Sequence, residues 1–328
     1  MNTFFRRLLS STPRDDPFSQ FGPVLKPSVY NKIRDPGTLK PNHLSEFGPI
    51  RKKKSAKKDI LSKETILSPP HHQSVKVKEP SVFPMMNDTR PLCVSPPPDH
   101  SSVLRLPFTH SQDCPSVSRV LAATMSEQSR ANLARWEAEK IALLGADGFK
   151  KYKTEMFSRG KTLHSILENF LETSELPRPS DLDDEVSKRH LVSVSQVIRC
   201  VDRPLALESA VHHKNLGYSG IVDCVAVIGN TVTLIDWKTS ERVKNSAAAL
   251  YDNPLQVAAY VGAINADPAY EGLGSISHGA VVVIYNTGYP AMLHTFDQEQ
   301  LAKYWKLWCE RLNMYKENIV FKKDKNIR

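Results

Sequence analysis

The stretch SGIVDCVAVIGNTVTLIDWKTS, residues 219–240, alternates apolar residues with small or polar ones on either side of Gly229 and Asn230. Alternation at period two is typical of β-strands, and a Gly-Asn pair favours a two-residue hairpin turn. The pattern therefore predicts a β-hairpin whose strands run over 219–228 and 231–238.

Two acidic residues and a lysine lie on this predicted hairpin. Counting outward from the turn brings Asp223 opposite Asp236, and like charges in that position destabilise a sheet unless something compensates them. Lys238 lies two residues beyond Asp236 and so projects from the same face of the strand. A divalent cation would compensate the carboxylates, bind a phosphate and activate water, while the lysine orients that water. The three residues thus favour phosphodiester hydrolysis with Mg²⁺ or Mn²⁺, although a hairpin with surface acids has the same spacing.

Further polar residues recur at helical spacing. Gln256 and Tyr260 are one turn apart in a predicted helix over 246–266, so an amide and a phenol reach the same side and can bind a phosphate or a base. Upstream, His164 and Glu168 share one face of another predicted helix. Each pair also fits an ordinary helix face, so spacing alone assigns neither a role.

The predicted elements place helices around a mixed central β-sheet, which is an α/β architecture. One domain over about 106–328, with an N-terminal helical extension, is within the usual size of a single domain. The predicted helices span 130–145 (ended by Gly145 and Gly148), 150–174, 246–266 and 298–315, a loop spans 175–185, and further strands span 205–213, 279–285 and 291–296.

Order is expected to begin near Pro115. Either Ser116 or Ser118 can cap a short helix there, and the free N–H groups at a helix N-terminus can receive a phosphate. A purely structural cap fits the same residues, so both interpretations stay open.

The first hundred residues differ from the rest of the chain. They hold 17 Lys/Arg against 9 Asp/Glu and 15 of the 23 prolines, whereas the remainder is nearly neutral. Residues 1–14 combine three arginines and an apolar helical face with no acidic residue, which predicts a mitochondrial presequence and a matrix location. Residues 15–105 are predicted to be mostly disordered. Their basic run 51–58 fits a solvated tail, a contact to nucleic-acid backbone or a nuclear signal, of which the presequence disfavours the last.

Several functional classes are excluded. No apolar run approaches the roughly 18 residues that span a bilayer, so no membrane span is predicted. The five cysteines are widely separated and form no CxxC pair, which argues against a disulfide framework and a zinc finger. No iron–sulfur cluster is predicted, because only Cys309 follows the predicted hairpin. Arg159-Gly160-Lys161-Thr162 lacks the upstream glycine of a nucleotide-binding P-loop.

Five motifs give the chain a family resemblance. PSVSRVL, RGKTLHSILE, ESAVHHKNLGYSGIVD, LIDWKTS and LQVAAY follow one another between about residues 115 and 315. In this order they resemble the PD-(D/E)XK nucleases, in particular the RecB-like exonuclease branch. The resemblance implies the restriction-endonuclease-like core of that superfamily.

The resemblance also implies roles for the hairpin and for the helix that follows it. Asp223 and Asp236 would ligate Mg²⁺ or Mn²⁺, and Lys238 would be the catalytic lysine. Gln256 and Tyr260 match the substrate-binding QxxxY helix of the family.

Three more residues of the resemblance lie upstream of the hairpin acids. His164 would be a further metal ligand or a close neighbour of the metal, and Glu168 would line the same site. Glu208 fills an acidic position that family members use variably.

With the presequence, the resemblance implies a monomeric, single-strand-specific DNA exonuclease. It would trim flaps and linear ends beside the mitochondrial DNA replication machinery. Trp136, Tyr152 and Phe157 would stack unpaired bases or pack in the core. Two alternatives stay open: a nuclease of the same fold acting on RNA or duplex DNA, and a non-catalytic nucleic-acid-binding module.

Overall fold

The computed structural model describes most of the C-terminal two thirds of the chain and short stretches before it. The described residues are 17–21, 84–86, 89–93, 102–108, 114–182 and 184–325. All of them belong to one compact unit. The predicted presequence 1–14 and the basic run 51–58 lie outside the described residues.

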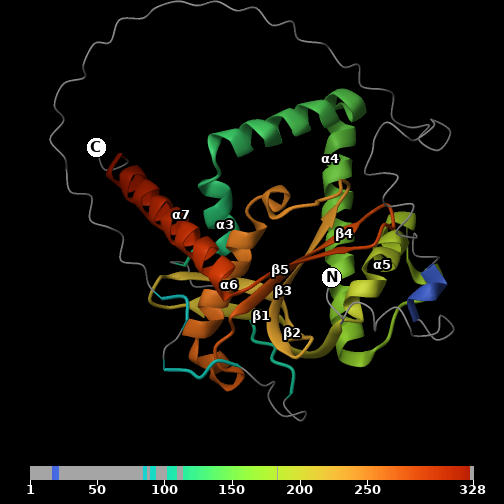
Figure 1. Cartoon of the computed structure of the whole chain (residues 1–328). Coiled ribbons are helices and arrows are strands. Elements are labelled where there is room, and N and C mark those ends of the chain that lie inside the picture. Colours follow the sequence, from blue (N-terminus) through green and yellow to red (C-terminus); the bar gives the residue numbers. More distant parts are fainter. Residues whose placement is uncertain are drawn as a thin grey trace, which may run out of the picture. The chain divides into compact units, whose positions relative to one another are not determined.

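A five-stranded sheet forms the centre of the described chain (Figure 1). Its order is β1-β2-β3-β4-β5, and all neighbours are antiparallel except β3 and β4. The parallel pair needs a crossover connection, which α6 provides. The mixed sheet and its flanking helices confirm the predicted α/β class. The strands are β1 (Val201–His213), β2 (Tyr218–Ile228), β3 (Thr231–Ser240), β4 (His278–Tyr285) and β5 (Met292–Phe296).

The β2–β3 hairpin has the predicted register over five pairs, but the predicted pairing of Asp223 with Asp236 is not part of the ladder. Ile228 pairs with Thr231, and the ladder continues outward to the last pair, Cys224 and Ile235. Both turn residues have positive φ, 54° at Gly229 and 70° at Asn230, as a type I′ turn requires. The two strands part directly beyond the last pair, next to the two aspartates.

Helices cover both faces of the sheet (Figure 1). One apolar core joins the sheet to α3, α6 and α7, and a second core joins its other face to α4 and α5. Packing of α6 on α7 is close, because a Cβ at Gly262 would lie 2.2 Å from the Trp305 ring. The helices are α3 (Val117–Ala123), α4 (Glu127–Thr173), α5 (Glu185–Ile198), α6 (Asn253–Ala266) and α7 (Gln298–Lys325), with the short 3-10 turns η2 (Pro17–Phe21), η4 (Pro179–Asp181), η5 (Ala247–Leu250) and η6 (Pro268–Leu273).

The helical extension differs from the prediction in one detail. The chain breaks at Gly145, where φ is 73° and ψ is 169°, and the second limb of α4 starts at once. Gly148 therefore lies inside a helix and ends none. A single residue in a conformation that only glycine adopts easily is enough to bend α4.

Two other segments also differ from their predictions. The pattern assigns no element to 186–204, yet α5 fills most of it, because Asp184 caps the helix by accepting the N–H groups of Val186 and Ser187. The predicted helix 246–266 is two elements, η5 and α6, separated at Tyr251, where φ is 55°. The alternation of Ser and Val in α5 gives no clear helical period. The start of α6 did have a sequence signal, Pro254 in its first turn, which the prediction of one continuous helix did not use.

Short stretches of the proline-rich leader pack on the domain. Phe18 is 1% exposed and its ring meets Phe170 at 5.0 Å between centroids. Arg90 donates to the carbonyls of Ile264 and Asp267 at the end of α6. These contacts fix the positions of the described stretches near residues 17–21 and 89–93.

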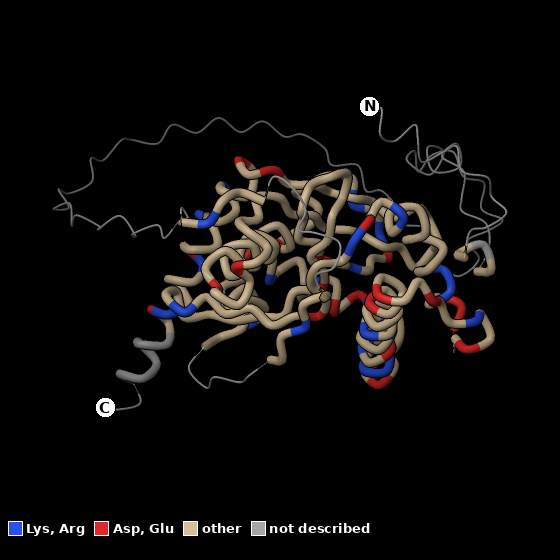
Figure 2. Tube along the Cα trace, turned by 90° about the horizontal axis from the view of Figure 1, so that it is seen from below, with Lys and Arg blue, Asp and Glu red and all other residues tan. Residues whose placement is uncertain are grey.

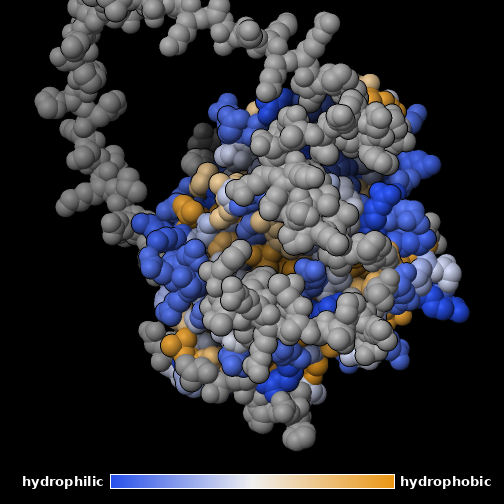
Figure 3. Space-filling view, turned by 45° about the vertical axis from the view of Figure 1, so that its right-hand side comes forward, coloured by the Kyte–Doolittle hydropathy of each residue, from blue (hydrophilic) through white to orange (hydrophobic). Residues whose placement is uncertain are grey.

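The surface of the described chain is polar and mixed in charge. Basic and acidic residues alternate along the visible helices (Figure 2). On the face drawn in Figure 3, apolar residues form small patches between hydrophilic ones. In the part of the chain that the structure describes, no helix is both long and apolar enough to cross a membrane.

Candidate active site

The side chains of β1 and β2 switch from one face of the sheet to the other at Glu208 and Asp223. Leu207 and Cys224 are paired and belong to the core under α4 and α5, whereas the next pair, Ser209 and Val222, lies on the side of α6. Glu208, between them, has φ of 40°, which is uncommon for a residue with a side chain. Because the side chains switch faces at this point, the carboxylates of Glu208 and Asp223 lie outside both apolar cores. Backbone strain of this kind collects at functional sites.

The Asp223 carboxylate fills the gap that opens where β2 and β3 part. Its Oδ2 accepts the backbone N–H of Trp237 at 2.8 Å, in place of a ladder bond. Its Oδ1 lies 3.6 Å from Nδ1 of His164, and the same nitrogen lies 3.4 Å from Oε1 of Glu208. One atom from each of these three side chains lies within 4.8 Å of the other two.

His164 reaches this cluster from the second limb of α4 and is fixed by its other ring nitrogen. Nε2 lies 3.1 Å from the carbonyl oxygen of Trp237, and a carbonyl only accepts, so Nε2 carries a hydrogen. Nδ1 therefore faces the carboxylates of Glu208 and Asp223. Burial alone would lower the pKa of His164, but the hydrogen bond to Glu208 and the charge of Asp223 raise it.

Asp236 and Lys238 form an ion pair beside the cluster. Asp236 is 1% exposed, and Lys238 Nζ lies 2.8 Å from its Oδ1 and 2.7 Å from its Oδ2. Burial, with repulsion from Asp236, raises the pKa of Asp223 to about 7. Burial acts to lower the pKa of Lys238, but the two carboxylates outweigh it and raise that pKa. Lys238 is therefore a cation at neutral pH and compensates part of the acidic charge.

The donor set fits a hard divalent cation. Carboxylate oxygens are the preferred protein ligands of Mg²⁺, and Mn²⁺ accepts an imidazole among them. A metal-ligating histidine normally donates its second ring N–H to a carbonyl or carboxylate, as His164 does to Trp237. The position of His164 also favours a cation. If its Nδ1 carried no hydrogen, its lone pair would face two negative carboxylates, and a cation or a proton between them would remove that repulsion.

Gln256 and Tyr260 lie on α6 as predicted and contact each other. Gln256 Nε2 donates to Tyr260 Oη at 3.2 Å. Burial and the charges of Asp236 and Asp223 raise the pKa of Tyr260, so its phenol stays protonated next to the acidic cluster. The pair thus offers an amide and a hydroxyl at the edge of the site.

Gly220 is a site residue that sequence reasoning missed. A Cβ there would lie 2.4 Å from Cε1 of Tyr260, so only glycine lets the ring approach β2 this closely. The available signal was a glycine inside a strand, which often marks close approach of another group.

Other predicted site residues are engaged elsewhere. Glu168 lies one turn beyond His164, but its carboxylate pairs with Arg105, which also bonds Glu172 at 2.7 Å. Ser116, not Ser118, caps α3 by accepting the N–H of Arg119 at 3.2 Å. The structure thus shows Ser116 as the cap of α3, and a phosphate contact at this end of the helix stays a prediction.

The three aromatic candidates lie on α4. Trp136 packs across the break at Gly145 against Phe149 and Tyr152, with ring centroids 5.8 and 6.4 Å apart. The Tyr152 hydroxyl bonds Glu241, which follows β3, and Phe157 remains 68% exposed. Trp136 therefore holds the two limbs of α4 together.

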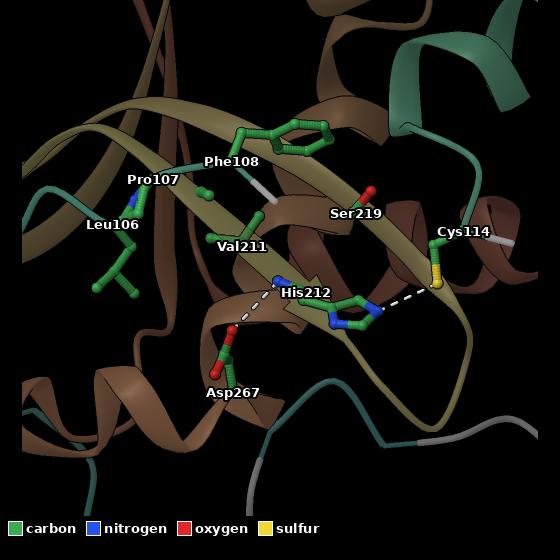
Figure 4. A pocket seen from close by; sticks show the side chains of 9 residues that line it. Leu106, Pro107, Phe108, Cys114, Val211, His212, Ser219 and Asp267 are labelled. Atoms are coloured by element: carbon green, nitrogen blue, oxygen red, sulfur yellow. Dashed lines mark hydrogen bonds between the residues drawn. The ribbon is translucent and has the colours of Figure 1, made fainter. Parts of the chain in front are cut away.

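A separate cavity of about 230 Å³ lies near the turn that connects β1 and β2 (Figure 4). Leu106, Phe108 and Val211 give it an apolar wall. His212 lies between two polar partners, with its Nε2 3.1 Å from Cys114 Sγ and its backbone N–H donated to Asp267 at 3.2 Å. None of the predicted site residues lines this cavity.

Comparison with known proteins gives relatives that share most of the domain. The chain is 40% identical over 230 residues to mitochondrial genome maintenance exonuclease 1 of Homo sapiens, covering 70% of this chain and 65% of the relative. The Mus musculus protein of that name is 35% identical over 272 residues, covering 83% and 74%. The Xenopus tropicalis protein is 41% identical over 203 residues, covering 62% and 57%. The aligned part thus spans less than two thirds of the human and frog proteins.

The family assignment covers the site as well as the fold. Residues 121–323 match the sequence profile of the PD-(D/E)XK nuclease superfamily, a range that contains His164, Glu208 and both hairpin aspartates. The geometry around the hairpin and this match agree, and the chain belongs to the PD-(D/E)XK nuclease superfamily.

Proposed function

We propose that this chain is a metal-dependent DNA exonuclease that acts at the cluster of His164, Glu208 and Asp223. The observation that carries the proposal is the convergence of these three donors beside the Asp236–Lys238 ion pair. Relatives named as exonucleases support the same reaction class.

Four side chains would hold the cation. His164 Nδ1, Glu208 and Asp223 provide the convergent donors, and Asp236, which raises the pKa of Asp223 by repulsion, adds a neighbouring carboxylate. When bound, Mg²⁺ or Mn²⁺ would polarise the scissile phosphate and make a bound water more acidic. The assignment of Glu208 as a ligand rests on its distance of 3.4 Å to His164.

Lys238 would act as a fixed cation. Its raised pKa keeps it protonated, so it would orient the attacking water and stabilise negative charge that develops on the phosphate. Removing a preorganised donor of this kind typically costs on the order of 100-fold or more in turnover. Its contact to Asp236 holds the ammonium in position before substrate arrives.

Gln256 and Tyr260 would bind the nucleotide next to the scissile bond. The amide and the phenol are both hydrogen-bond donors, and the raised pKa of Tyr260 keeps its proton available for a phosphate oxygen. Four further residues remain predicted substrate contacts, although their side chains have other partners or lie on helix surfaces. They are Glu168, Ser116, Ser118 and Trp136.

The finer function follows from the relatives and the N-terminal sequence. We propose that the substrates are single-stranded or flapped DNA, and that the protein works in the mitochondrial matrix beside the DNA replication machinery. The relatives' name and the acid-free, arginine-containing residues 1–14 support that location. The interspersed charges of the described surface favour a narrow nucleic-acid contact over a broad basic face for duplex DNA (Figure 2).

The experiment compares end-labelled single-stranded DNA, flapped DNA, duplex DNA and RNA of one sequence, with Mg²⁺, Mn²⁺ or EDTA. We expect cleavage of the single-stranded and flapped DNA only, with metal required. Lys238→Ala should lower turnover by about 100-fold or more, whereas Lys303→Ala, an exposed lysine on α7, should match the wild type.

Each alternative has its own outcome in this assay. If RNA or duplex DNA is cleaved as fast as single-stranded DNA, the proposed preference for single strands is wrong. Binding without cleavage would identify a non-catalytic module, and cleavage by Lys238→Ala at the wild-type rate would refute the role of the lysine.

A further inference from the structure

The connection between β3 and α6 holds an exposed tyrosine in a strained conformation. Tyr251 is 68% exposed, with φ of 55° and ψ of −126°. These angles belong to the first central position of a type II′ turn, which glycine normally occupies. A side chain kept in such a conformation at the surface contributes little to the apolar core, so its benefit must be sought outside folding.

Contacts on both sides of Tyr251 maintain this conformation. Leu250 is 1% exposed in the core, and the Asp252 carboxylate pairs with Arg311 of α7 at 3.0 Å. α6 then begins at Asn253, with Pro254 in its first turn. The backbone is thus held on each side of the tyrosine while the ring points to solvent.

Lys244 covers one face of the Tyr251 ring. Its Nζ lies 4.1 Å from the ring centroid. The lysine backbone is fixed as well: its N–H donates to Tyr285 Oη at 3.2 Å, and its carbonyl accepts from His294 at 3.0 Å. A cation and an aromatic ring are therefore presented together on anchored backbone.

This pair is close in the chain to the elements that carry the candidate active site. Lys244 follows β3, four residues after its last residue, Ser240, and β3 carries Asp236 and Lys238. Tyr251 precedes the first turn of α6, which carries Gln256. Tyr251 is thus five residues before the predicted substrate-binding amide of Gln256.

We infer that Tyr251 and Lys244 form a clamp for one unpaired nucleotide of the substrate strand. The open face of the ring stacks on the base, and the ammonium contacts a flanking phosphate. In a duplex both faces of an internal base are already stacked, so the clamp selects single strands. The inference rests on the proposed DNA-cleaving function and explains how that site would recognise an unpaired strand.

The experiment uses Tyr251→Gly, because glycine suits the backbone angles and removes only the ring. The full-length protein is given single-stranded DNA of one length with either normal bases or abasic residues. For the wild type, KM with normal bases should be about 5- to 20-fold lower than with abasic residues. Tyr251→Gly should lose this difference with little change in kcat, and its Tm should not fall.

Three further variants make the test specific. Tyr251→Phe should keep the wild-type discrimination, since it keeps the ring. Lys244→Ala should raise KM and weaken its salt dependence. Leu307→Ala, an exposed apolar residue of α7, should leave both constants unchanged.

The inference is overturned if Tyr251→Gly discriminates between normal and abasic strands as the wild type does. Fluorescence anisotropy with the same two strands in EDTA measures binding without cleavage. If the wild type binds but cuts neither strand, the proposed activity fails, while the difference in binding between wild type and Tyr251→Gly still decides the clamp.

Discussion

Replacing Gly220 with alanine should damage the site although it replaces no ionisable residue. The new Cβ would lie 2.4 Å from Cε1, 3.2 Å from Cζ and 3.3 Å from Oη of Tyr260. Carbon atoms in contact are normally about 3.5 Å apart, so the ring must move by roughly 1 Å. Tyr260 is only 4% exposed and has little space to move into.

Two effects follow from this displacement. Overpacking of a core typically costs about 1 to 3 kcal/mol, which for a domain of this size lowers Tm by roughly 3 to 10 °C. The phenol also leaves its position 3.2 Å from Gln256, so KM should rise. Calorimetry measures the first effect and steady-state cleavage of single-stranded DNA the second.

Gly272→Ala is the matched control, because nothing lies within 4 Å of a Cβ at that position. In the double variant Gly220→Ala/Tyr260→Val the smaller side chain makes room for the new methyl group, so stability should recover in part while KM stays high. Wild-type Tm and KM in Gly220→Ala would refute the reasoning, because the ring would then have tolerated the contact.

Three further predictions concern the cation, pH and the leader. Adding Mg²⁺ or Mn²⁺ at 100 times its Kd should stabilise the protein by about 2.7 kcal/mol and raise its Tm. If the metal raises the Tm of a Glu208→Gln variant as much as that of the wild type, Glu208 is not a ligand. Burial lowers the pKa of His190 to about 4, with Asp184 acting to raise it and Arg159 to lower it, so the unfolded chain takes up the proton first as pH falls. The contribution of this residue should be complete above pH 6.5 and lost by about pH 4, a decrease of roughly 3 kcal/mol. Urea titrations at a series of pH values should show a smaller loss of unfolding free energy for His190→Leu. Part of the remaining loss comes from His213, whose pKa burial also lowers to about 4, whereas Asp223, whose pKa burial raises to about 7, acts in the opposite direction. Phe18→Ala should lower the free energy of unfolding by about 3 kcal/mol, because its ring is buried against Phe170, and an unchanged urea midpoint would show that residues 17–21 do not contribute to the fold.

The sequence pattern predicted the hairpin well because neighbouring residues determine both its strands and its turn. The period of two set the strands, and the Gly229-Asn230 turn fixed the pairing from Ile228 and Thr231 outward. The same reasoning located Gln256 and Tyr260 on one helix face, where the structure shows them in contact.

Elements failed where local signals conflicted with packing. The Ser-Val alternation of α5 gives no clear helical period, and its helix is fixed by the Asp184 cap and by burial against the sheet. The break at Tyr251 has no glycine at its positive φ, and the ion pair of Asp252 with Arg311 and the burial of Leu250 hold it. The burial of α5 against the sheet and the ion pair of Asp252 with Arg311 each join residues far apart in the sequence.

The sequence by itself determined which two aspartates stand at the open end of the hairpin and which lysine accompanies them. Only the tertiary structure decided which charges meet: Glu208 lies beside His164, Asp236 pairs with Lys238, and Glu168 pairs with Arg105. Periodicity specifies the face of a strand or helix on which a side chain lies. The partner of a charge depends instead on which elements meet there, and that is settled when the sheet, α4 and α6 pack together.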